Sequence, residues 1–554
     1  MSLNIRDGVL LYYQEEPGET EITLPDEVTV ISGFGFHHCK NIVRVNAKNV
    51  RLIDWQAFEG CQRLESVCIT DSPVSIKREA FEGCRSLKQV LIPKGVTEIG
   101  RRAFAGCTSL QEAVLPQEID TIPAGSFVDC RSLKTVVIPE GVTHIEKRAF
   151  YGCTALSDIV IPDSVRTIGS AVFEKTAWLS HQSDDFVIVN HILLRYQGSE
   201  ASVTIPDGIQ VIGQEAFREN TFLTEVNFPD SLRIIDDKAF FDCTALKSIR
   251  IPNGVTKVGK KAFYRCTALQ TVDIPSSVRE IRNQAFAGTP WIDHYPEDYV
   301  VVGDGILIRY NGSDSVLHLP TSVKRIGVNV FCDCHEITEV VLPYGVVEIG
   351  WGAFLGCSSL KNVNIPDSVT TIGAKVFAFC SALTHLVIPP SVTTMGHASF
   401  SLCRSLERVE APHQAIEATP VECYACFKLR YLHWGHYLVV GDPKEVSDFT
   451  SRKIQHLQEK GDYSIRINNT VKYGIALGNY LSSAQPEAEQ YIRENLPAIL
   501  AHYLRFHGYE AVQALLTDEH FAYIRHDDAL LDCLVQQTGM DKTKIRELFD
   551  QLSG

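Results

Sequence analysis

The sequence predicts a solenoid, in which short coils stack along one axis, followed by an all-helical module. A phenylalanine recurs at a fixed period over most of the 554-residue chain, and a cysteine follows it three residues later. The period disappears near residue 446, where helical periodicity takes over. We therefore expect about sixteen coils in residues 1–446 and a helical module in residues 447–554.

The phenylalanine column defines the repeat. Its members are Phe36, Phe58, Phe81, Phe104, Phe127, Phe150 and Phe173, then Phe217, Phe240, Phe263 and Phe286, then Phe331, Phe354, Phe377 and Phe400. After Phe58, the step within each of these three blocks is 23 residues. A fixed period of about 20–29 residues is typical of leucine-rich repeats. The predicted fold class is thus mainly a β/α solenoid, a right-handed leucine-rich-repeat superhelix.

One coil, residues 87–110, shows the elements we expect. Its Leu-x-x-Val-x-Ile segment alternates with period 2 and is rich in β-branched residues, which predicts a short parallel strand. Pro93 lacks an N–H group and ends that strand. A second short extended segment closes at Gly100, and residues 101–110 are expected to form a helical turn that points Phe104 inward.

The inward side chains are expected to form two structural ladders. The first ladder contains Phe58, Phe81, Phe104, Phe127 and Phe150, and the second contains Cys61, Cys84, Cys107, Cys130 and Cys153. Neighbouring coils lie about 4.7–4.9 Å apart, whereas a disulfide needs Cβ atoms about 3.8 Å apart. We therefore predict buried free thiols. Cys423 and Cys426 form a C-x-x-C pair, but a zinc site needs more ligands, so no metal is expected.

The units resemble the BspA-like subfamily of leucine-rich repeats, known from bacterial and protist surface antigens. The motif I-P-x-x-V-x-x-I-G-x-x-A-F-x-x-C-x-x-L recurs, with small variations, at Ile138–Leu156 and Ile365–Leu383. The resemblance covers residues 10–432. It implies a bacterial adhesin or another ligand-binding protein rather than an enzyme.

The register breaks twice, near residues 180–210 and 293–325. At each break a threonine replaces the cysteine and a tryptophan follows it, as in Thr176 and Trp178. Each break continues with two apolar segments joined by Asn-His or Asp-Gly, which predicts a β-hairpin. We expect these hairpins to continue the sheet with longer coils, and half of such a hairpin, residues 7–13, to cap the first coil.

The C-terminal module shows helical periodicity between residues 475 and 504. Two similar segments that begin at Gly508 and Gly539 lie 31 residues apart, near the ankyrin period of 33. We expect paired helices, and ankyrin-like pairs are one candidate arrangement. The module either caps the solenoid or binds a second partner. His502 and His507 are expected to be solvated at a helix end.

The candidate binding face follows from the strand alternation. The outward position of successive strands is apolar at Cys68, Leu91, Val114, Val137 and Val160, and polar farther along, at Arg250 and Asp273. Two residues earlier, polar side chains such as Glu112 and Asp158 frame this row. An exposed aliphatic row often marks an interface. We place it on the concave face, where an acidic rim suits a basic or neutral protein; the alternatives are strand propensity or a covering segment of the same chain.

Composition and motifs limit the function classes. The net charge of -15 disfavours a general affinity for nucleic acid, and no apolar run predicts membrane insertion. No catalytic motif and no cofactor fingerprint is present, so we expect a monomeric, non-enzymatic protein-binding platform without cofactors. It is either an adhesin-like receptor or an intracellular scaffold whose helical module binds a second partner. The location is cytoplasmic if Met1 is the native start, and cell-surface or secreted if a signal peptide was removed.

Overall fold

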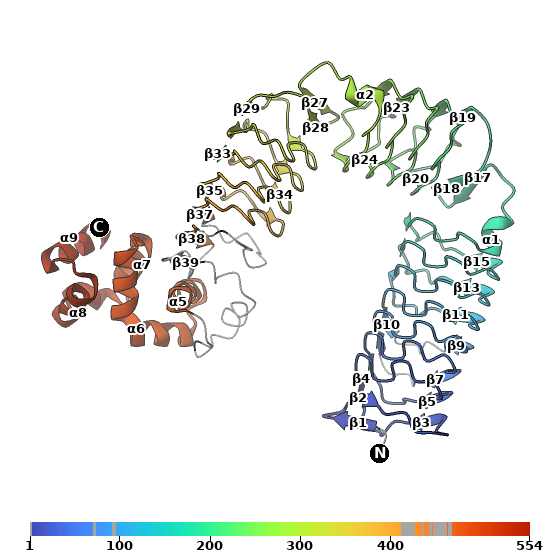
Figure 1. Ribbon diagram of the computed structural model, residues 1–554, viewed down its shortest axis with the longest axis horizontal. Helices are drawn as coiled ribbons and strands as arrows, with labels where there is room; N and C mark the ends of the chain where they lie inside the picture. The colour runs from blue at the N-terminus through green and yellow to red at the C-terminus, as the bar shows by residue number, and fades with distance from the viewer. Residues whose placement is uncertain are drawn as a thin grey trace. The chain divides into compact units, whose positions relative to one another are not determined.

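The computed structural model describes residues 3–69, 74–90, 96–411, 426, 428–434, 437–441, 446, 463 and 468–553. The chain forms two compact units (Figure 1). The first unit contains residues 1–280 and 284–294, and the second contains residues 281–283 and 295–554. The division falls near the second interruption of the repeat, so the helical module shares a unit with the coils that precede it.

The first block of the first unit contributes one strand per coil to each of two rows. One row contains β1 (Leu3–Arg6), β2 (Val9–Tyr13), β4 (Val30–Ile31), β6 (Leu52–Ile53), β8 (Val74–Ile76), β10 (Val96–Ile99), β12 (Thr121–Ile122), β14 (His144–Ile145) and β16 (Thr167–Ile168). The other row contains β3 (Glu21–Thr23), β5 (Arg44–Asn46), β7 (Ser66–Cys68), β9 (Gln89–Val90), β11 (Glu112–Val114), β13 (Thr135–Val137) and β15 (Asp158–Val160). Apart from the β1–β2 hairpin, neighbouring strands within each sheet are parallel and in matching register.

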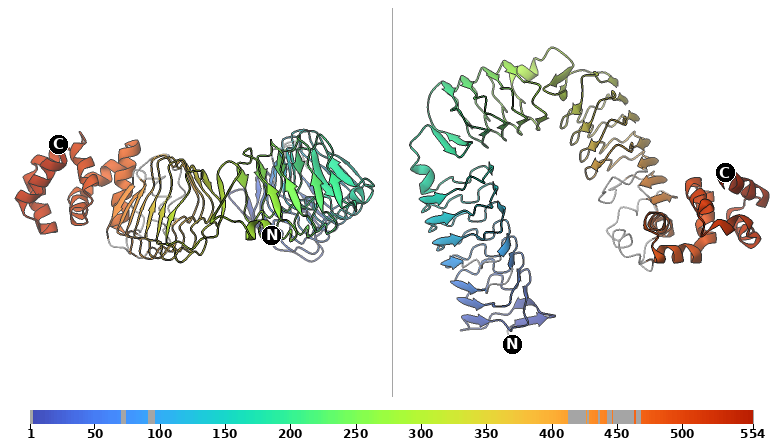
Figure 2. Two further views of the ribbon diagram at one scale, coloured as in Figure 1. Left: turned by 90° about the horizontal axis from the view of Figure 1, so that it is seen from above. Right: turned by 180° about the vertical axis from the view of Figure 1, so that it is seen from behind.

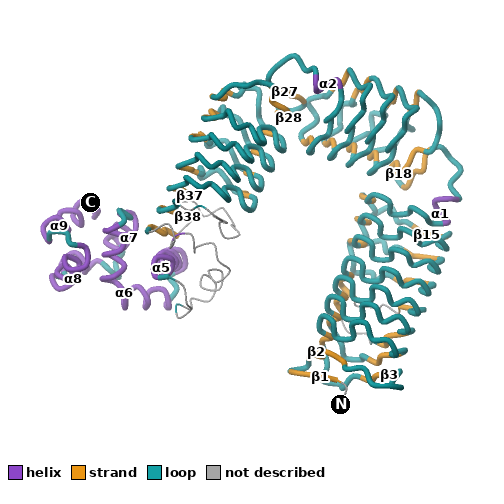
Figure 3. Tube along the Cα trace, in the orientation of Figure 1, coloured by secondary structure: helices purple, strands orange, loops and turns teal. Residues whose placement is uncertain are grey.

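The second block of the first unit repeats this plan. It contains α1 (Ala177–Ser180), β17 (Phe186–Val189), β18 (Ile192–Tyr196), β19 (Ser202–Thr204), β20 (Val211–Ile212), β21 (Glu225–Asn227), β22 (Ile234–Ile235), β23 (Ser248–Arg250), β24 (Lys257–Val258), β25 (Thr271–Asp273), β26 (Glu280–Ile281) and α2 (Pro290–Asp293). The strands are short, and turns and loops make up most of each coil (Figure 3).

The second unit begins with a third block of coils and ends in helices. Its strands are β27 (Tyr299–Val302), β28 (Ile306–Tyr310), β29 (Val316–His318), β30 (Arg325–Ile326), β31 (Glu339–Val341), β32 (Glu348–Ile349), β33 (Asn362–Asn364), β34 (Thr371–Ile372), β35 (His385–Val387), β36 (Thr394–Met395), β37 (Arg408–Ala411), β38 (Tyr431–Trp434) and β39 (Tyr437–Val440). Its helices are α5 (Asn469–Ser483), α6 (Pro486–Arg505), α7 (Tyr509–Thr517), the 3₁₀ helix η2 (Ala522–His526), α8 (Asp528–Thr538) and α9 (Lys542–Ser553).

The coils form a β-solenoid of about seventeen turns, and the helical turn expected in each coil is wrong. Residues 101–110 form hydrogen-bonded turns in which Arg102 and Gly106 adopt left-handed backbone conformations, with φ of 58° and 72°. The backbone N–H of Phe104 donates to the carbonyl of Ser126 at 2.9 Å, in the next coil. Because such amides pair between coils rather than with the preceding turn, no α-helix forms.

The phenylalanine ladder is confirmed. Its rings are buried and stack nearly parallel: the Phe36 and Phe58 centroids lie 4.8 Å apart with an interplanar angle of 5°, and those of Phe104 and Phe127 lie 5.4 Å apart at 14°. Each ring therefore fills the space between the coils above and below it, and the core is continuous along the stack.

The cysteine ladder is confirmed as well, and each thiol has a defined partner. The Sγ atom of Cys107 donates to the carbonyl of Phe81 at 3.3 Å, and that of Cys130 donates to Phe104 at 3.1 Å. All cysteines in the described part of the chain are free thiols. Burial raises the pKa of Cys84, Cys107 and Cys130, because the thiolate would lose its hydration.

We expect a thiol reagent to modify Cys68 first in the folded protein. Cys68 is exposed, whereas the ladder thiols are buried and stay protonated. Cys107 and Cys130 should react at least about 100-fold more slowly, because reaction requires local opening. Peptide mapping after timed alkylation measures these rates, and Cys68→Ser is the control that removes the fast site. Equal rates at Cys68 and Cys107 would contradict the buried ladder.

Each interruption closes one stack and opens another. At the first, the Thr176 hydroxyl accepts from the Leu179 backbone N–H and caps α1, and Trp178 covers the last ring of the block, Phe173, at 4.8 Å. The hairpin β17–β18 then starts a new sheet, and Tyr196 stacks on Phe217 at 5.0 Å. The hairpin prediction is confirmed, but the hairpin does not continue the preceding sheet, because β16 is the last strand of its own.

The helical module packs on the last strands of the second unit. Tyr503 of α6 is fully buried, and its hydroxyl donates to the carbonyl of Leu438 at 2.7 Å. The Nε2 atom of His502 bonds to the carbonyl of Val440, so the expectation of a solvated His502 is wrong. A Cβ atom on Gly474 of α5 would lie 2.7 Å from the Leu438 oxygen, which shows how closely the helix approaches β39. These contacts cap the open end of the sheet.

Candidate protein-binding face

Three valines form an exposed row on adjacent strands of the first unit. Val114, Val137 and Val160 end β11, β13 and β15, pair directly in the parallel register, and are 63%, 63% and 61% exposed. The preceding residues Ala113 and Val136 are buried, because successive strand residues point to opposite sides. We call the row and its flanking side chains on these three strands the valine face.

The structure brings together only part of the predicted site. Glu112 and Asp158 are exposed on the valine face, while Cys68 is exposed on β7, in a neighbouring sheet. Arg250 and Asp273 lie on a different sheet and pair with each other at 3.4 Å. Leu91 lies outside the described residues. The strand order thus separates residues that one repeat column groups together.

A second row of acidic side chains follows the valines in the turns. Glu118, Glu140 and Asp163 are exposed three or four residues after the valine of their strand. We did not predict this row from the sequence, although an acidic residue directly after proline, as in Pro139-Glu140 and Pro162-Asp163, signals it. The valines therefore lie between acidic side chains on both sides, and Lys134 is the one exposed cation in residues 111–118, 134–141 and 157–164.

These carboxylates are not neutralised in the described part of the chain. Glu112, Glu118, Glu140, Asp158 and Asp163 form no ion pair there. Elsewhere on the same row of strands, neighbouring coils do pair their charges, as in Arg44 with Glu21 at 3.1 Å. The valine face therefore combines exposed apolar surface with uncompensated negative charge, which attracts cations.

The valine face lies on the opposite side of the coils from β12, β14 and β16 (Figures 1 and 2). Within the first unit the coils bend toward the side of these shorter strands, so the valines lie on the outer side of the bend (Figure 1). The predicted concave position does not hold in this unit. Helix α1 is inserted on the valine side, and this extra chain widens the stack there (Figure 1).

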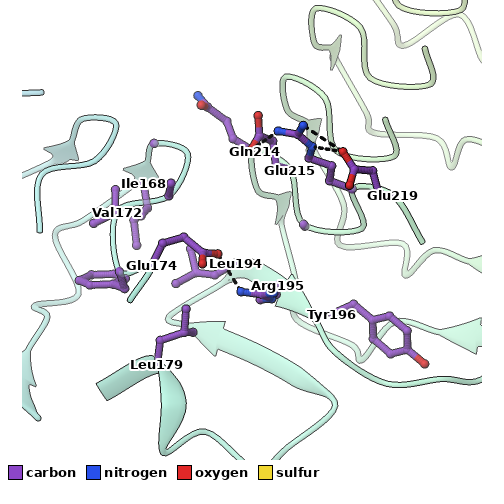
Figure 4. Close-up of a pocket in the computed structure, with 15 residues that line it drawn as sticks. Ile168, Val172, Glu174, Leu179, Leu194, Arg195, Tyr196, Gln214, Glu215 and Glu219 are labelled. Carbon is purple, nitrogen blue, oxygen red and sulfur yellow. Dashed lines mark hydrogen bonds and ion pairs between the residues drawn. The ribbon is translucent and has the colours of Figure 1, made fainter. Parts of the chain in front are cut away.

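A cavity of about 350 Å³ lies beside the first interruption (Figure 4). Charged side chains dominate its lining, but they pair with one another: Arg195 with Glu174 at 2.7 Å, and Arg218 with Glu219 at 3.0 Å. Glu215 also contacts Lys238 at 2.9 Å. Because each carboxylate in this cavity has a cationic partner, we interpret the cavity as a joint between two blocks of coils.

Two other kinds of site can be examined in the described residues. No group of three or more histidine, cysteine and acidic side chains there has the arrangement to hold a metal ion. Among the same residues, no helix is long and apolar enough to cross a membrane.

The stacked coils, their inward ladders and their paired rows of strands define a leucine-rich-repeat protein, a class consistent with a role in binding other proteins. The sequence profile of the BspA type Leucine rich repeat region matches in six copies, over residues 12–72, 51–180, 194–296 and 310–430. These ranges cover more than half of the chain, which therefore belongs to this family.

Several solved structures are similar to the chain. A leucine-rich repeat protein from Bacteroides ovatus is 23% identical, with 71% of this chain and 96% of that chain covered and a TM-score of 0.30. A leucine rich cell surface protein from Faecalibacterium prausnitzii is 24% identical, with 77% and 90% covered and a TM-score of 0.26. A T. pallidum leucine-rich repeat protein is 28% identical, with 39% and 82% covered and a TM-score of 0.20. No curated protein matches the chain.

Proposed function

We propose that the protein is a non-enzymatic, adhesin-like receptor that binds a protein ligand through the valine face. The observation that carries the proposal is the row of three exposed valines in register, between two rows of exposed carboxylates. Side chains more than 60% exposed contribute little to the core, so packing does not explain an apolar row at these positions. Contiguous exposed apolar surface with a polar rim marks an interaction site.

The alternative of a scaffold with a second binding module has less support. Its helices would need a free recognition surface, whereas α5 and α6 place Gly474, His502 and Tyr503 against β39. These contacts favour capping as the role of that surface.

The test is a pull-down with Val137→Asp/Val160→Asp, using host-matrix and own-cell lysates. Burying two charges in an apolar contact should weaken capture of a specific ligand at least about tenfold. Val387→Asp is the matched control, because Val387 occupies the same repeat position in the second unit and is 54% exposed. Circular dichroism should first show that both variants fold. If the double variant and the control retain the same proteins as the wild type, the valine face is not the binding site.

A further inference from the structure

We propose that the ligand segment bound by the valine face is a cationic amphipathic α-helix lying across β11, β13 and β15. This inference rests on the proposed function and adds the chemistry of the ligand. It follows from three properties of the face: the backbone pairing of its strands, the spacing of its valines and the sign of its rim charges.

Backbone pairing excludes recognition by strand addition at the centre of the face. Strand β13 is hydrogen-bonded on both sides, to β11 and to β15, and β11 also pairs with β9. An extended peptide needs an open strand edge to add to a sheet. The centre of the valine face therefore offers a ligand its side chains only, which is how a helix is recognised in a groove or on a flat apolar strip.

The spacing of the valines matches the pitch of a helix. Adjacent strands lie about 4.8 Å apart, so three successive valines span about 9.6 Å. A helix advances about 5.4 Å per turn, so apolar residues at i, i+3 or i+4, and i+7 span about 10.5 Å. In an extended chain, side chains on one face lie about 6.8 Å apart and lose register with the valines after one step. A helix that runs perpendicular to the strands keeps one apolar residue near each valine.

The charges give the composition of the helix flanks. Glu112 lies two residues from Val114 on the same strand face, about 6.8 Å away, and Glu140 lies three residues beyond Val137, at most about 10 Å away. Lysine and arginine side chains on either flank of a helix reach such distances, because their stems lie along apolar surface while the charged ends extend. The five carboxylates without ion pairs therefore fit a helix with basic residues on both sides of its apolar stripe.

The neighbouring coils limit the length of the site. The second block has polar side chains in the valine column, at Asn227, Arg250 and Asp273, and Arg250 and Asp273 neutralise each other. The apolar row with uncompensated acids is thus confined to three described strands of the first unit. Three rungs correspond to about two to three turns, or roughly eight to eleven residues of helix.

The experiment measures binding of labelled 14-residue peptides to the full chain by fluorescence anisotropy. The probe carries leucines at i, i+3/i+4 and i+7 and lysines on both flanks. One comparison peptide has the same composition with the stripe scrambled, a second has glutamates in place of the lysines, and a third has a central proline that prevents helix formation. We expect the probe to bind at least about tenfold more tightly than each comparison peptide, and less tightly as salt is raised.

Protein variants assign the binding to the valine face. Val137→Asp/Val160→Asp and Glu112→Lys/Asp158→Lys should each weaken probe binding at least about tenfold, while Val387→Asp leaves it unchanged. Equal binding of the scrambled or proline peptide overturns the helix proposal, as does probe binding that the valine variant does not change. If the pull-down shows that the valine variant loses a protein ligand but the probe does not bind, the proposed function stands and the helical ligand is wrong.

Discussion

Replacing Phe104 by alanine is expected to destabilise the first unit by about 3–5 kcal/mol. Phe104 is fully buried, and its ring stacks on Phe81 and on Phe127, with centroids 5.4 Å away on each side. Truncation removes contacts with both neighbouring coils and leaves a cavity in the middle of the stack. The backbone cannot collapse readily into that cavity, because the N–H of Phe104 is fixed to Ser126 in the next coil.

Urea unfolding followed by circular dichroism measures this loss, and hydrogen exchange shows where the stack opens. Phe222→Ala is the matched control: Phe222 belongs to the same unit and is 67% exposed, so its truncation should change stability by less than about 0.5 kcal/mol. A loss below about 1 kcal/mol for Phe104→Ala would mean that the ring stack does not hold neighbouring coils together.

The inward ladders could be predicted from the sequence because the same local chemistry repeats in register. Parallel stacking of equivalent coils brings each phenylalanine next to its equivalent, so a period of 23 residues translates directly into ring contacts such as Phe104 on Phe127. The thiol ladder follows for the same reason. Its hydrogen bonds connect residues 26 positions apart, one repeat plus the three residues that separate phenylalanine from cysteine.

The turns could not be predicted in the same way, because their stabilising partners are not local. The amide of Arg102 donates to Ala124 in the next coil, and Arg102 itself has a φ of 58°. An arginine in the left-handed region contradicts its local preference, so propensity alone favours a helical turn. Pairing between coils outweighs that preference.

The candidate site shows the same division between local and non-local information. Strand alternation alone predicts that Val114, Val137 and Val160 point outward. It does not show that α1 and the following hairpin end one sheet and start another, and this break separates Arg250 and Asp273 from the valines. The column of a residue follows from the repeat, whereas the sheet it joins depends on hydrogen bonds across the interruption.

Removal of the Tyr503 side chain is the prediction with the largest expected effect on the second unit. Tyr503→Ala should destabilise that unit by about 3–5 kcal/mol, because it leaves a cavity between α6 and β39 and removes the donor to the Leu438 carbonyl. Tyr503→Phe removes only the hydroxyl and should cost about 1–3 kcal/mol, the penalty for an unsatisfied buried acceptor. Tyr523→Ala, at a position 45% exposed, is the control.

The two Tyr503 variants together distinguish a cap from an independent helical module. If α5 and α6 cap the sheet, hydrogen exchange in residues 431–440 should accelerate in Tyr503→Ala, since the edge strand β39 loses the cover of its carbonyl groups. Gly474→Val should have the same effect from the opposite helix, because its side chain would meet the Leu438 carbonyl and force α5 away. Unchanged exchange in these strands, with faster exchange confined to the helices, would show that the helical module folds without supporting the solenoid, and would restore binding of a second partner as its role.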